Sequence, residues 1–560
     1  MYLLKIILLT LSLLSPLAAN TLLPIKEHIN HYTSSGFRST IHALYKINNY
    51  HPLWVGEHNR KQFAQLLEAL DDPIFNYKFK SFNQEKIIDL SFAIESGSVS
   101  ADKLTQLDIL ITESYLKLIH FIRTGDVDWA LVKRKLRKLK DSQDVHAAWE
   151  IHPKGMPKTQ SMFSAINKHN IKGYLVSILP LVDQYQPLIK ILEHYRKMPK
   201  FAKIPYGKTL KPGRMDERIR QIKKLLQFTG DFPRNESTGT GYTKSLSRAI
   251  ASFKERFNLA KGDYIDNKVI KYLNTTKEEY LRKIITNLDM LKLQPHRFEP
   301  NHVQINIPEF KLRYYQGGHV AFESDVIVGR IDRPTPIFSD KIEYMVLNPT
   351  WTITDNLVRR DLIPVLKKNP HYLEEHNIHV FTSYKKGVKE TSLDREKLFR
   401  YEHNKKPIPY RFVQFPSEKN ALGRIKFMFP NKYAVYLHDT DNKSLFNYRY
   451  RVYSSGCMRV KRPYDFMYAL LDNAGNHYSK SKLQKVFESN KPTTIHLKRS
   501  IPVHVLYQTV RRDRGKDYFF YDVYMYEQIV YESTAGHKKS TFRVPEKRLT
   551  KIERIGARIR

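Results

Sequence analysis

The residues with the clearest capacity for chemistry are a cysteine and a histidine in the C-terminal third of the chain. Cys457 is the single cysteine among 560 residues and follows Ser454-Ser455-Gly456, while His438 ends the segment Val435-Tyr436-Leu437-His438. A cysteine attacks as its thiolate, and a free thiol is mostly protonated near neutral pH, so it needs a base such as an imidazole. The two residues together predict a thiol nucleophile with its general base.

The neighbours of this pair indicate how acyl transfer would be assisted. Gly456 allows a tight turn, so that the backbone amides of Gly456 and Cys457 can point at a carbonyl oxygen as an oxyanion hole. Arg459 would favour the thiolate and bind a substrate carboxylate in bidentate fashion, with a structural ion pair as its alternative role. The alternative for Cys457 is a small buried apolar side chain, because free cysteines are often buried.

The elements that must position these residues follow from the spacing of apolar side chains. Apolar and polar residues alternate between residues 303 and 328 and again between 503 and 524, which predicts antiparallel strands on both sides of the cysteine. The apolar run Val435-Tyr436-Leu437 places His438 at the end of a strand. We therefore expect a mostly β, sandwich-like domain over residues 300–530.

The preceding half of the chain has a helical pattern. Apolar residues recur at intervals of three or four between Ala101 and Gly125, as on one face of a long helix, and we expect a helical scaffold over residues 25–202. Residues 203–276 contain three short helical patterns separated by glycine and proline. The predicted fold class is a multidomain α+β protein.

The first residues have the pattern of an export signal. Lys5 precedes the apolar run 6–14 and small residues follow at Ala18 and Ala19, which predicts a secretory signal over residues 1–19. Because Leu17 is larger than ideal before the cleavage point, an uncleaved inner-membrane anchor is the alternative. Either form predicts a periplasmic protein, and a lone cysteine in an exported chain is a candidate reactive thiol.

The charge balance predicts an anionic neighbour. The chain has 94 Lys and Arg against 56 Asp and Glu, a formal net charge of +38, and its last residues, 531–560, form a basic tail. Nucleic acid is the first partner that such a charge suggests, but export and the lack of zinc-finger or RNP-type motifs argue against it. A cell-wall polymer or the inner-membrane surface is the expected partner, and a solvated surface without a ligand is the alternative.

Six motifs follow one another in the C-terminal half of the chain. They are Val303-Gln304-Ile305-Asn306-Ile307-Pro308-Glu309-Phe310, Val328-Gly329-Arg330 with Arg333-Pro334-Thr335-Pro336, Asn348-Pro349-Thr350-Trp351, Gly423-Arg424-Ile425-Lys426-Phe427, Tyr436-Leu437-His438-Asp439-Thr440 and Ser454-Ser455-Gly456-Cys457-Met458-Arg459-Val460. Through these motifs the chain from about 301 to 530 resembles the catalytic domain of the L,D-transpeptidases (YkuD type), cysteine enzymes that cross-link peptidoglycan. Ser455 and Arg459 stand where the usual family pattern has histidine and asparagine, as in the large periplasmic Gram-negative branch, which also carries a helical scaffold and a peptidoglycan-binding domain.

The resemblance implies roles for single residues. Cys457 would be the nucleophile and His438 the proton acceptor and donor, with the backbone carbonyl near Asp439 orienting the imidazole. Tyr436 would join the Gly456 and Cys457 amides in the oxyanion hole, and Ser455 would hold the loop or touch substrate.

The resemblance also implies the walls and the cover of the cleft. Trp351 and Tyr433 would line the donor groove, with core packing as the alternative for both. The segment 356–420 would be a lid over the substrate cleft, with a decorative loop as the alternative. Residues 203–276 resemble a peptidoglycan-binding domain, with a packing module that binds no glycan as the alternative.

The implied reaction is acyl transfer through a cysteine thioester between peptidoglycan stem peptides, giving 3-3 cross-links, with carbapenems acylating the same cysteine. Water as acceptor would make a carboxypeptidase or hydrolase, a lipoprotein lysine or a free D-amino acid would make another transferase, and a non-catalytic wall-binding scaffold is the rival from another class. No cofactor is expected. No metal is expected either, because the i,i+3 pairs His28/His31 and His376/His379 lack a His-Glu-x-x-His pattern.

Overall fold

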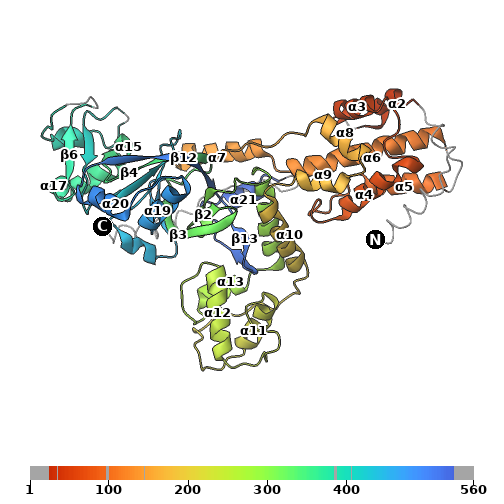
Figure 1. The fold of residues 1–560 in the computed structure, drawn as a ribbon. Helices are drawn as coiled ribbons and strands as arrows, with labels where there is room; N and C mark the ends of the chain where they lie inside the picture. Colours follow the sequence, from red (N-terminus) through yellow and green to blue (C-terminus); the bar gives the residue numbers. More distant parts are fainter. Residues whose placement is uncertain are drawn as a thin grey trace.

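The protein has an elongated helical part, a sheet-containing part and a smaller helical unit beside their junction (Figure 1). The expected signal segment 1–19 and the expected tail from residue 535 onward lie outside the described residues. Within the part of the chain that the structure describes, no helix has the length and apolar character needed to cross a bilayer. The structure is a computed structural model that describes residues 24–33, 36–95, 100–143, 145–383, 388–404 and 406–534.

The N-terminal helices pack around one long central helix, α6 (Ala101–Arg123), as the apolar period predicts. Asp108 of α6 is fully buried and accepts hydrogen bonds from the amides of Leu53, Trp54 and Val55 at 2.7–3.0 Å, which fixes an irregular loop against the helix. The other elements of this bundle are α2 (Ile25–Tyr32), α3 (Arg38–Ile47), η3 (Glu57–Asn59), α4 (Arg60–Asp71), α5 (Gln84–Glu95), α8 (Thr159–Asn167) and α9 (Ile171–Ser177). Helix α10 (Val182–Arg196) follows the bundle and packs on α14 (Lys277–Leu291) and β13 (Val510–Asp513) (Figure 1).

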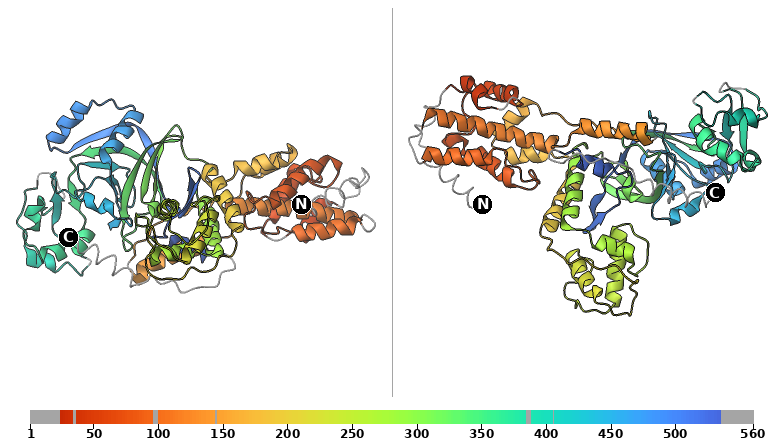
Figure 2. Two further views of the ribbon diagram at one scale, coloured as in Figure 1. Left: turned by 90° about the horizontal axis from the view of Figure 1, so that it is seen from below. Right: turned by 180° about the vertical axis from the view of Figure 1, so that it is seen from behind.

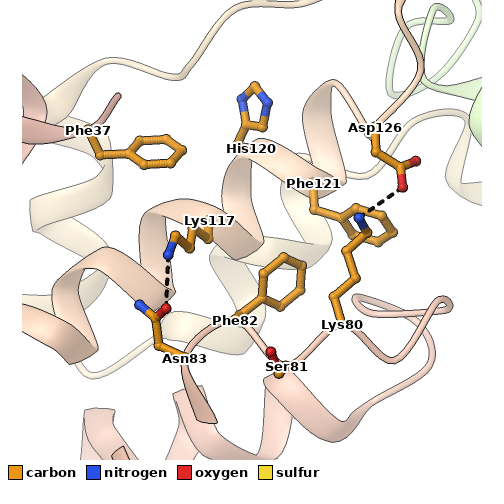
Figure 3. Close-up of a pocket in the computed structure, with 10 residues that line it drawn as sticks. Phe37, Lys80, Ser81, Phe82, Asn83, Lys117, His120, Phe121 and Asp126 are labelled. Atoms are coloured by element: carbon orange, nitrogen blue, oxygen red, sulfur yellow. Dashed lines mark hydrogen bonds and ion pairs between the residues drawn. The ribbon is translucent and has the colours of Figure 1, made fainter. Parts of the chain in front are cut away.

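The bundle has a surface cavity of about 460 Å³ that is lined in part by Phe82, Phe121, Lys80 and Lys117 (Figure 3). Lys80 pairs with Asp126 at 2.8 Å, and Lys117 contacts Asn83 at 2.9 Å and Glu113 at 3.4 Å. Both ammonium groups are therefore already neutralised by protein carboxylates.

The smaller unit contains the three short helices expected between residues 203 and 276. Arg256 and Asp231 form an ion pair inside it in which both side chains are 2% exposed. The helix α14, which follows, begins with a capping box at Thr276 and Glu279 and packs on α10. The helices are α11 (Arg218–Phe228), α12 (Lys244–Arg256), α13 (Asn267–Leu273) and α14 (Lys277–Leu291).

The C-terminal part is built on a nine-stranded sheet with the order β10-β3-β11-β9-β8-β4-β12-β1-β2, which curves so that β2 also pairs with β3. Most neighbours are antiparallel, whereas β1 and β12, β10 and β3, and β11 and β9 run parallel. The strands are β1 (His302–Asn306), β2 (Lys311–Gln316), β3 (His319–Gly329), β4 (Ser339–Leu347), β8 (Ile425–Met428), β9 (Leu437–His438), β10 (Val452–Ser454), β11 (Met458–Val460) and β12 (Thr493–Leu506).

Helices and a hairpin surround this sheet and join it to the rest of the chain. The hairpin of β13 and β14 packs against α10, α12 and α14, which links the sheet-containing part to both helical parts (Figure 1). These elements are η4 (Ile307–Glu309), η6 (Lys443–Asn447), α19 (Pro463–Asn473), α20 (Lys480–Glu488), β13 (Val510–Asp513), β14 (Lys516–Phe519) and α21 (Tyr526–Tyr531).

The insertion 356–420 is a folded unit rather than a plain loop. Its strands β6 and β7 form a three-stranded sheet of order β5-β7-β6 with the strand β5 that precedes the insertion. Apolar residues such as Ile363, Leu398 and Phe412 are fully buried and form a separate core. The elements are β5 (Trp351–Ile353), α15 (Asp355–Leu357), η5 (Val358–Leu362), α16 (Ile363–Leu366), α17 (Tyr372–Glu375), β6 (Ile378–Phe381), α18 (Arg395–Phe399) and β7 (Arg411–Gln414).

Helix α7 (Trp129–Gln143) leaves the bundle and runs to the sheet, as Figure 1 and the right view of Figure 2 show. Its apolar residues belong to the core of the C-terminal part, and Lys135 pairs with Glu532 at 3.1 Å. Trp149 then bridges to Ile337 beside β4. Residues 127–151 lie within the range expected for the scaffold, yet they pack with the sheet.

Candidate active site

Three adjacent strands of the large sheet bring the predicted residues together. In the parallel pair of β9 and β11, His438 is the partner of Arg459 and Leu437 is the partner of Met458. In the antiparallel pair of β8 and β9, His438 is the partner of Lys426. Leu437 and Met458 are fully buried in the core, so the residues next to them along the same strand project from the opposite face of the sheet. His438, Arg459 and Lys426 therefore share one face of the sheet.

Cys457 and Tyr436 immediately precede β11 and β9 and belong to the same face by alternation. The Met458 amide donates to the Tyr436 carbonyl at 3.0 Å, which fixes the register at this point. Ideal strand spacing and rise put the Cα atoms of Cys457 and His438 about 8 Å apart on neighbouring strands, with both side chains on the same face of the sheet. Among the described residues, no hydrogen bond of standard geometry joins the sulfur to the imidazole, as is common in unliganded active sites.

The loop before the cysteine is held by hydroxyl groups. Gly456 has φ +115°, a conformation that is open only to glycine at low cost. The Ser454 hydroxyl accepts the Gly456 amide at 3.3 Å and donates to the Cys457 carbonyl at 2.5 Å, while the Thr335 hydroxyl donates to the Gly456 carbonyl at 2.9 Å. One of the two amides expected to form the oxyanion hole, that of Gly456, is thus already committed within the loop.

His438 is kept neutral by its surroundings. It is 4% exposed, and burial together with the positive charge of Arg459 lowers the pKa of the imidazole to about 3, with smaller contributions from Lys426 and Lys443. Nδ1 has no hydrogen-bond partner of standard geometry among the described residues, although the Asp439 backbone lies close enough to raise the pKa of the ring. The imidazole is therefore a neutral base at physiological pH.

Cys457 is half-buried, and its thiol is also neutral at rest. Burial raises the pKa of the thiol above its ordinary value, and the Tyr436 backbone and hydroxyl, Lys426 and Arg459 each counteract part of this increase. The expectation that Arg459 favours the thiolate agrees in direction with this effect, but burial outweighs it. The site therefore starts from a neutral thiol and a neutral imidazole, with hydrogen-bond donors and cations arranged around the sulfur.

The Asp439 side chain has a structural position behind the histidine. Its carboxylate is 3% exposed, accepts the Arg424 amide at 2.9 Å and pairs with Lys443. Gly423 is in contact with it, because a Cβ at Gly423 would lie 2.4 Å from the Asp439 Cγ. The carboxylate thus ties the segment that follows β9 to the residues that lead into β8.

Ser455 connects the cysteine loop to the insertion. Its exposed side chain accepts a hydrogen bond from Arg333 Nη1 at 3.0 Å, and the same guanidinium pairs with Asp361 of η5 at 2.5 Å. Arg459 donates to the Thr440 hydroxyl at 3.3 Å. The insertion therefore contacts the loop of the nucleophile through Arg333 and Asp361.

The two predicted groove residues have different surroundings. Trp351 is half-buried, and its side chain interacts with the Tyr436 hydroxyl, so it lies beside the site. The Tyr433 hydroxyl donates to Glu150 at 3.3 Å, and the centre of its ring lies 5.2 Å from that of Phe338. These contacts of Tyr433 are those of a residue that packs in the core, which was its alternative role.

Three residues beside the site were not singled out from the sequence. Lys426 and Arg333 lie inside two of the six motifs, which was the only available signal, and Asp361 lies in the insertion without any motif. All three act through contacts between distant segments, which spacing in the sequence does not reveal.

No group of three or more His, Cys, Asp or Glu side chains in the described ranges has the arrangement of a metal site. In the two histidine pairs, His28, His376 and His379 bond to the Pro24 carbonyl at 3.0 Å, the Tyr372 carbonyl at 3.0 Å and the Glu390 carboxylate at 2.8 Å.

Comparison with known proteins gives two family matches and one close relative. Residues 300–476 match the L,D-transpeptidase catalytic domain (YkuD), and residues 39–192 match the family described as "Scaffold domain". A Haemophilus influenzae protein described as a "Putative L,D-transpeptidase" is 34% identical over 258 residues, which are 46% of this chain and 50% of the relative. The chain thus spans about half the length of the curated relative that it matches.

Two solved structures are similar in a weaker sense. The "Ldtfm-avibactam carbamoyl enzyme" is 11% identical with a TM-score of 0.17, over 67% of this chain and 98% of its own. A fused Zn-dependent amidase/peptidase/peptidoglycan-binding protein from Clostridium acetobutylicum is 9% identical with a TM-score of 0.13, over 53% of this chain and 99% of its own. With such TM-scores, neither structure bears on the argument below.

Proposed function

Since residues 300–476 belong to the L,D-transpeptidase catalytic domain family and residues 39–192 to the scaffold-domain family, we propose that the chain is a peptidoglycan L,D-transpeptidase that forms 3-3 cross-links through a Cys457 thioester. The observation that carries the proposal is the common face of Cys457, Tyr436, His438 and Arg459 on adjacent strands of that domain. A domain of this family implies a peptidoglycan substrate.

In the first step the sulfur attacks the carbonyl of the L-centre of diaminopimelate in a donor stem tetrapeptide. The thiol proton passes to His438, the C–S bond forms, and negative charge develops on the carbonyl oxygen. The Tyr436 hydroxyl and the Cys457 amide are the donors for that oxygen, and preorganised donors of this kind contribute about 3 kcal/mol each.

The protonated imidazole is then a strong acid, because burial and the positive charges of Arg459, Lys426 and Lys443 disfavour its charged form. It donates its proton to the departing nitrogen, and D-alanine leaves as the thioester forms. This cationic surrounding makes proton transfer to the leaving group favourable and returns His438 to its neutral form.

In the second step the side-chain amine of a second stem attacks the thioester. Neutral His438 accepts the proton of that amine, the new amide bond forms, and Cys457 leaves and regains a proton. The insertion, which reaches the cysteine loop through Arg333 and Asp361, is the candidate for excluding water during the lifetime of the thioester.

The decisive experiment incubates the full chain with tetrapeptide muropeptides and weighs the products. We expect dimers that have lost one D-alanine, and no product from Cys457→Ala at an unchanged melting temperature. Tripeptide monomers alone would identify a carboxypeptidase or hydrolase instead. Turnover only with a lipoprotein lysine or a free D-amino acid would identify a different acceptor. Unchanged wall-related function in Cys457→Ala would favour a non-catalytic scaffold.

We further propose a periplasmic location and wall binding by residues 203–276, with anchoring at the inner-membrane surface as the alternative to cleavage of residues 1–19. The signal-like pattern of residues 1–19 and the net charge of +38 support this proposal. Fractionation of cells that express the full chain tests the location. Co-sedimentation with purified sacculi at low and high salt tests wall binding, and a chain that stays in the supernatant at low salt would contradict it.

A further inference from the structure

Lys426 lies at the candidate site, where so far it has entered only through the effect of its charge on His438 and on the thiol. It lies on β8 as the register partner of His438, and its neighbours Ile425 and Phe427 are fully buried on the opposite face. Its Nζ atom lies 3.9 Å from the centre of the Tyr436 ring. A cation on an aromatic face is attracted by the ring quadrupole, so Lys426 fixes the orientation of the tyrosine whose hydroxyl faces the sulfur.

The charge of Lys426 has no carboxylate partner. Among the ion pairs of the described residues, none within 4 Å involves Lys426, whereas the nearby Lys443 pairs with Asp439. Burial lowers the pKa of the Lys426 ammonium, and the sulfur of Cys457 is the group that raises it. An ammonium that is partly removed from water is costly without an anion nearby.

The anion that compensates this cost appears during the reaction. The titratable and charged groups on the face of Cys457 are Tyr436 just before β9, His438 on β9, Arg459 on β11 and Lys426 on β8. None of them carries a negative charge at rest, because the thiol and the phenol are protonated and the imidazole is neutral. The thiolate, and then the tetrahedral oxyanion, are therefore the negative charges that Lys426 meets.

We propose that Lys426 is a positioning residue of this site, which holds the Tyr436 ring against the sulfur and stabilises the Cys457 thiolate by its charge. This proposal rests on the proposed role of Cys457 as the nucleophile. The structural alternative is that the aliphatic stem of Lys426 merely fills space between Tyr436 and the sheet.

The two roles differ in what they predict for the thiol. Lys426→Met keeps the length and the apolar stem but removes the charge, whereas Lys426→Arg keeps the charge. Lys341→Met, on the exposed face of β4, is the matched control. Because Cys457 is the single cysteine, its alkylation by iodoacetamide in the full-length protein reports on this thiol alone and requires no peptidoglycan substrate.

We expect Lys426→Met to shift the alkylation profile between pH 6 and 10 to higher pH, with a rate at pH 7.5 about tenfold below that of the unsubstituted protein, as for a rise of one unit in the thiol pKa. Lys426→Arg and Lys341→Met should stay within about threefold. Lys426→Gln, which is shorter and uncharged, should behave like Lys426→Met, and it replaces that variant if Lys426→Met lacks a cooperative thermal transition.

An unchanged profile in a folded Lys426→Met or Lys426→Gln protein would overturn the proposal, and so would an equal shift in Lys426→Arg. A shifted profile in a protein that makes no cross-linked muropeptide would support the role of Lys426 and contradict the proposed transpeptidase activity. Different results would therefore contradict the role of Lys426 and the proposed transpeptidase activity.

Discussion

The neutral state of His438 predicts an unusual pH dependence of acylation. The pKa of the imidazole is about 3, compared with an ordinary value of about 6.5, because of its burial and the nearby Arg459. At pH 5 an ordinary histidine is about 3% neutral, whereas a histidine with a pKa of 3 is about 99% neutral. If the neutral imidazole is the base, the acylation rate at pH 5 should be about the same as at pH 7. With an ordinary histidine, the rate at pH 5 would be about 25-fold lower than at pH 7.

The acylation step can be measured without an acceptor, whose amine would titrate itself. The full chain is mixed with a carbapenem between pH 4 and pH 8, and the growth of the covalent adduct is followed by intact-protein mass. Circular dichroism at each pH shows whether the chain stays folded. We expect no decline of the adduct rate that is centred between pH 5 and 7, because the acidic limb lies below pH 4.

Arg459→Gln supplies the internal comparison. Removal of this cation should raise the pKa of His438 toward its ordinary value, so that the ratio of the rates at pH 5 and pH 7 becomes smaller than in the unsubstituted protein. An acidic limb with a midpoint near 6.5 in the unsubstituted protein would refute the reasoning, as would an Arg459→Gln profile identical to it. A chain without any adduct would refute the nucleophile itself.

Three other substitutions test separate contacts. Burial alone would raise the pKa of Glu309, but Arg313 and Arg511 lower it to about 2. Glu309→Gln should therefore reduce the free energy of unfolding by about 3 kcal/mol above pH 4.5, and this difference should disappear as the pH falls through 2. Urea titrations at several pH values measure it. Gly456→Ala should cost about 1–3 kcal/mol through its φ of +115° and slow carbapenem acylation, and equal melting temperatures and adduct rates would contradict this. Asp361→Asn removes the bidentate partner of a guanidinium that is 7% exposed and should speed limited proteolysis of the insertion, whereas Glu343→Gln on β4 should leave it unchanged.

Features that depend on residues close together in the sequence could be predicted from it. The apolar period between residues 101 and 125 predicts α6 because burial of one helical face is a local pattern, and the run before His438 predicts the strand end for the same reason. The six motifs predict the type of catalytic domain, which the family match confirms for residues 300–476. The roles of Cys457 and His438 stay predictions until the thiol is tested.

The remaining features depend on contacts between distant segments. The strands of the insertion contain only three or four residues each, too few for a clear alternation, so its small sheet was not predicted. The amphipathic pattern of α7 indicates that one face is buried but not which core buries it. The lowered pKa of His438 arises from its burial and from Arg459 and Lys426 on two other strands, and no spacing around His438 encodes these contacts.

The path of residues 127–151 limits where the chain can be divided. Val127 bridges to Thr534, the Trp149 ring stacks on Tyr526 at 5.8 Å, and the Glu150 amide donates to the Ile337 carbonyl at 2.9 Å. A fragment that begins at residue 300 would expose the apolar surface that Trp129 and Val132 cover. The segment before β4 would also lose its bridge between Ile337 and Trp149. A minimal catalytic fragment must therefore be assembled from two separated stretches of the gene product, for example by circular permutation or co-expression.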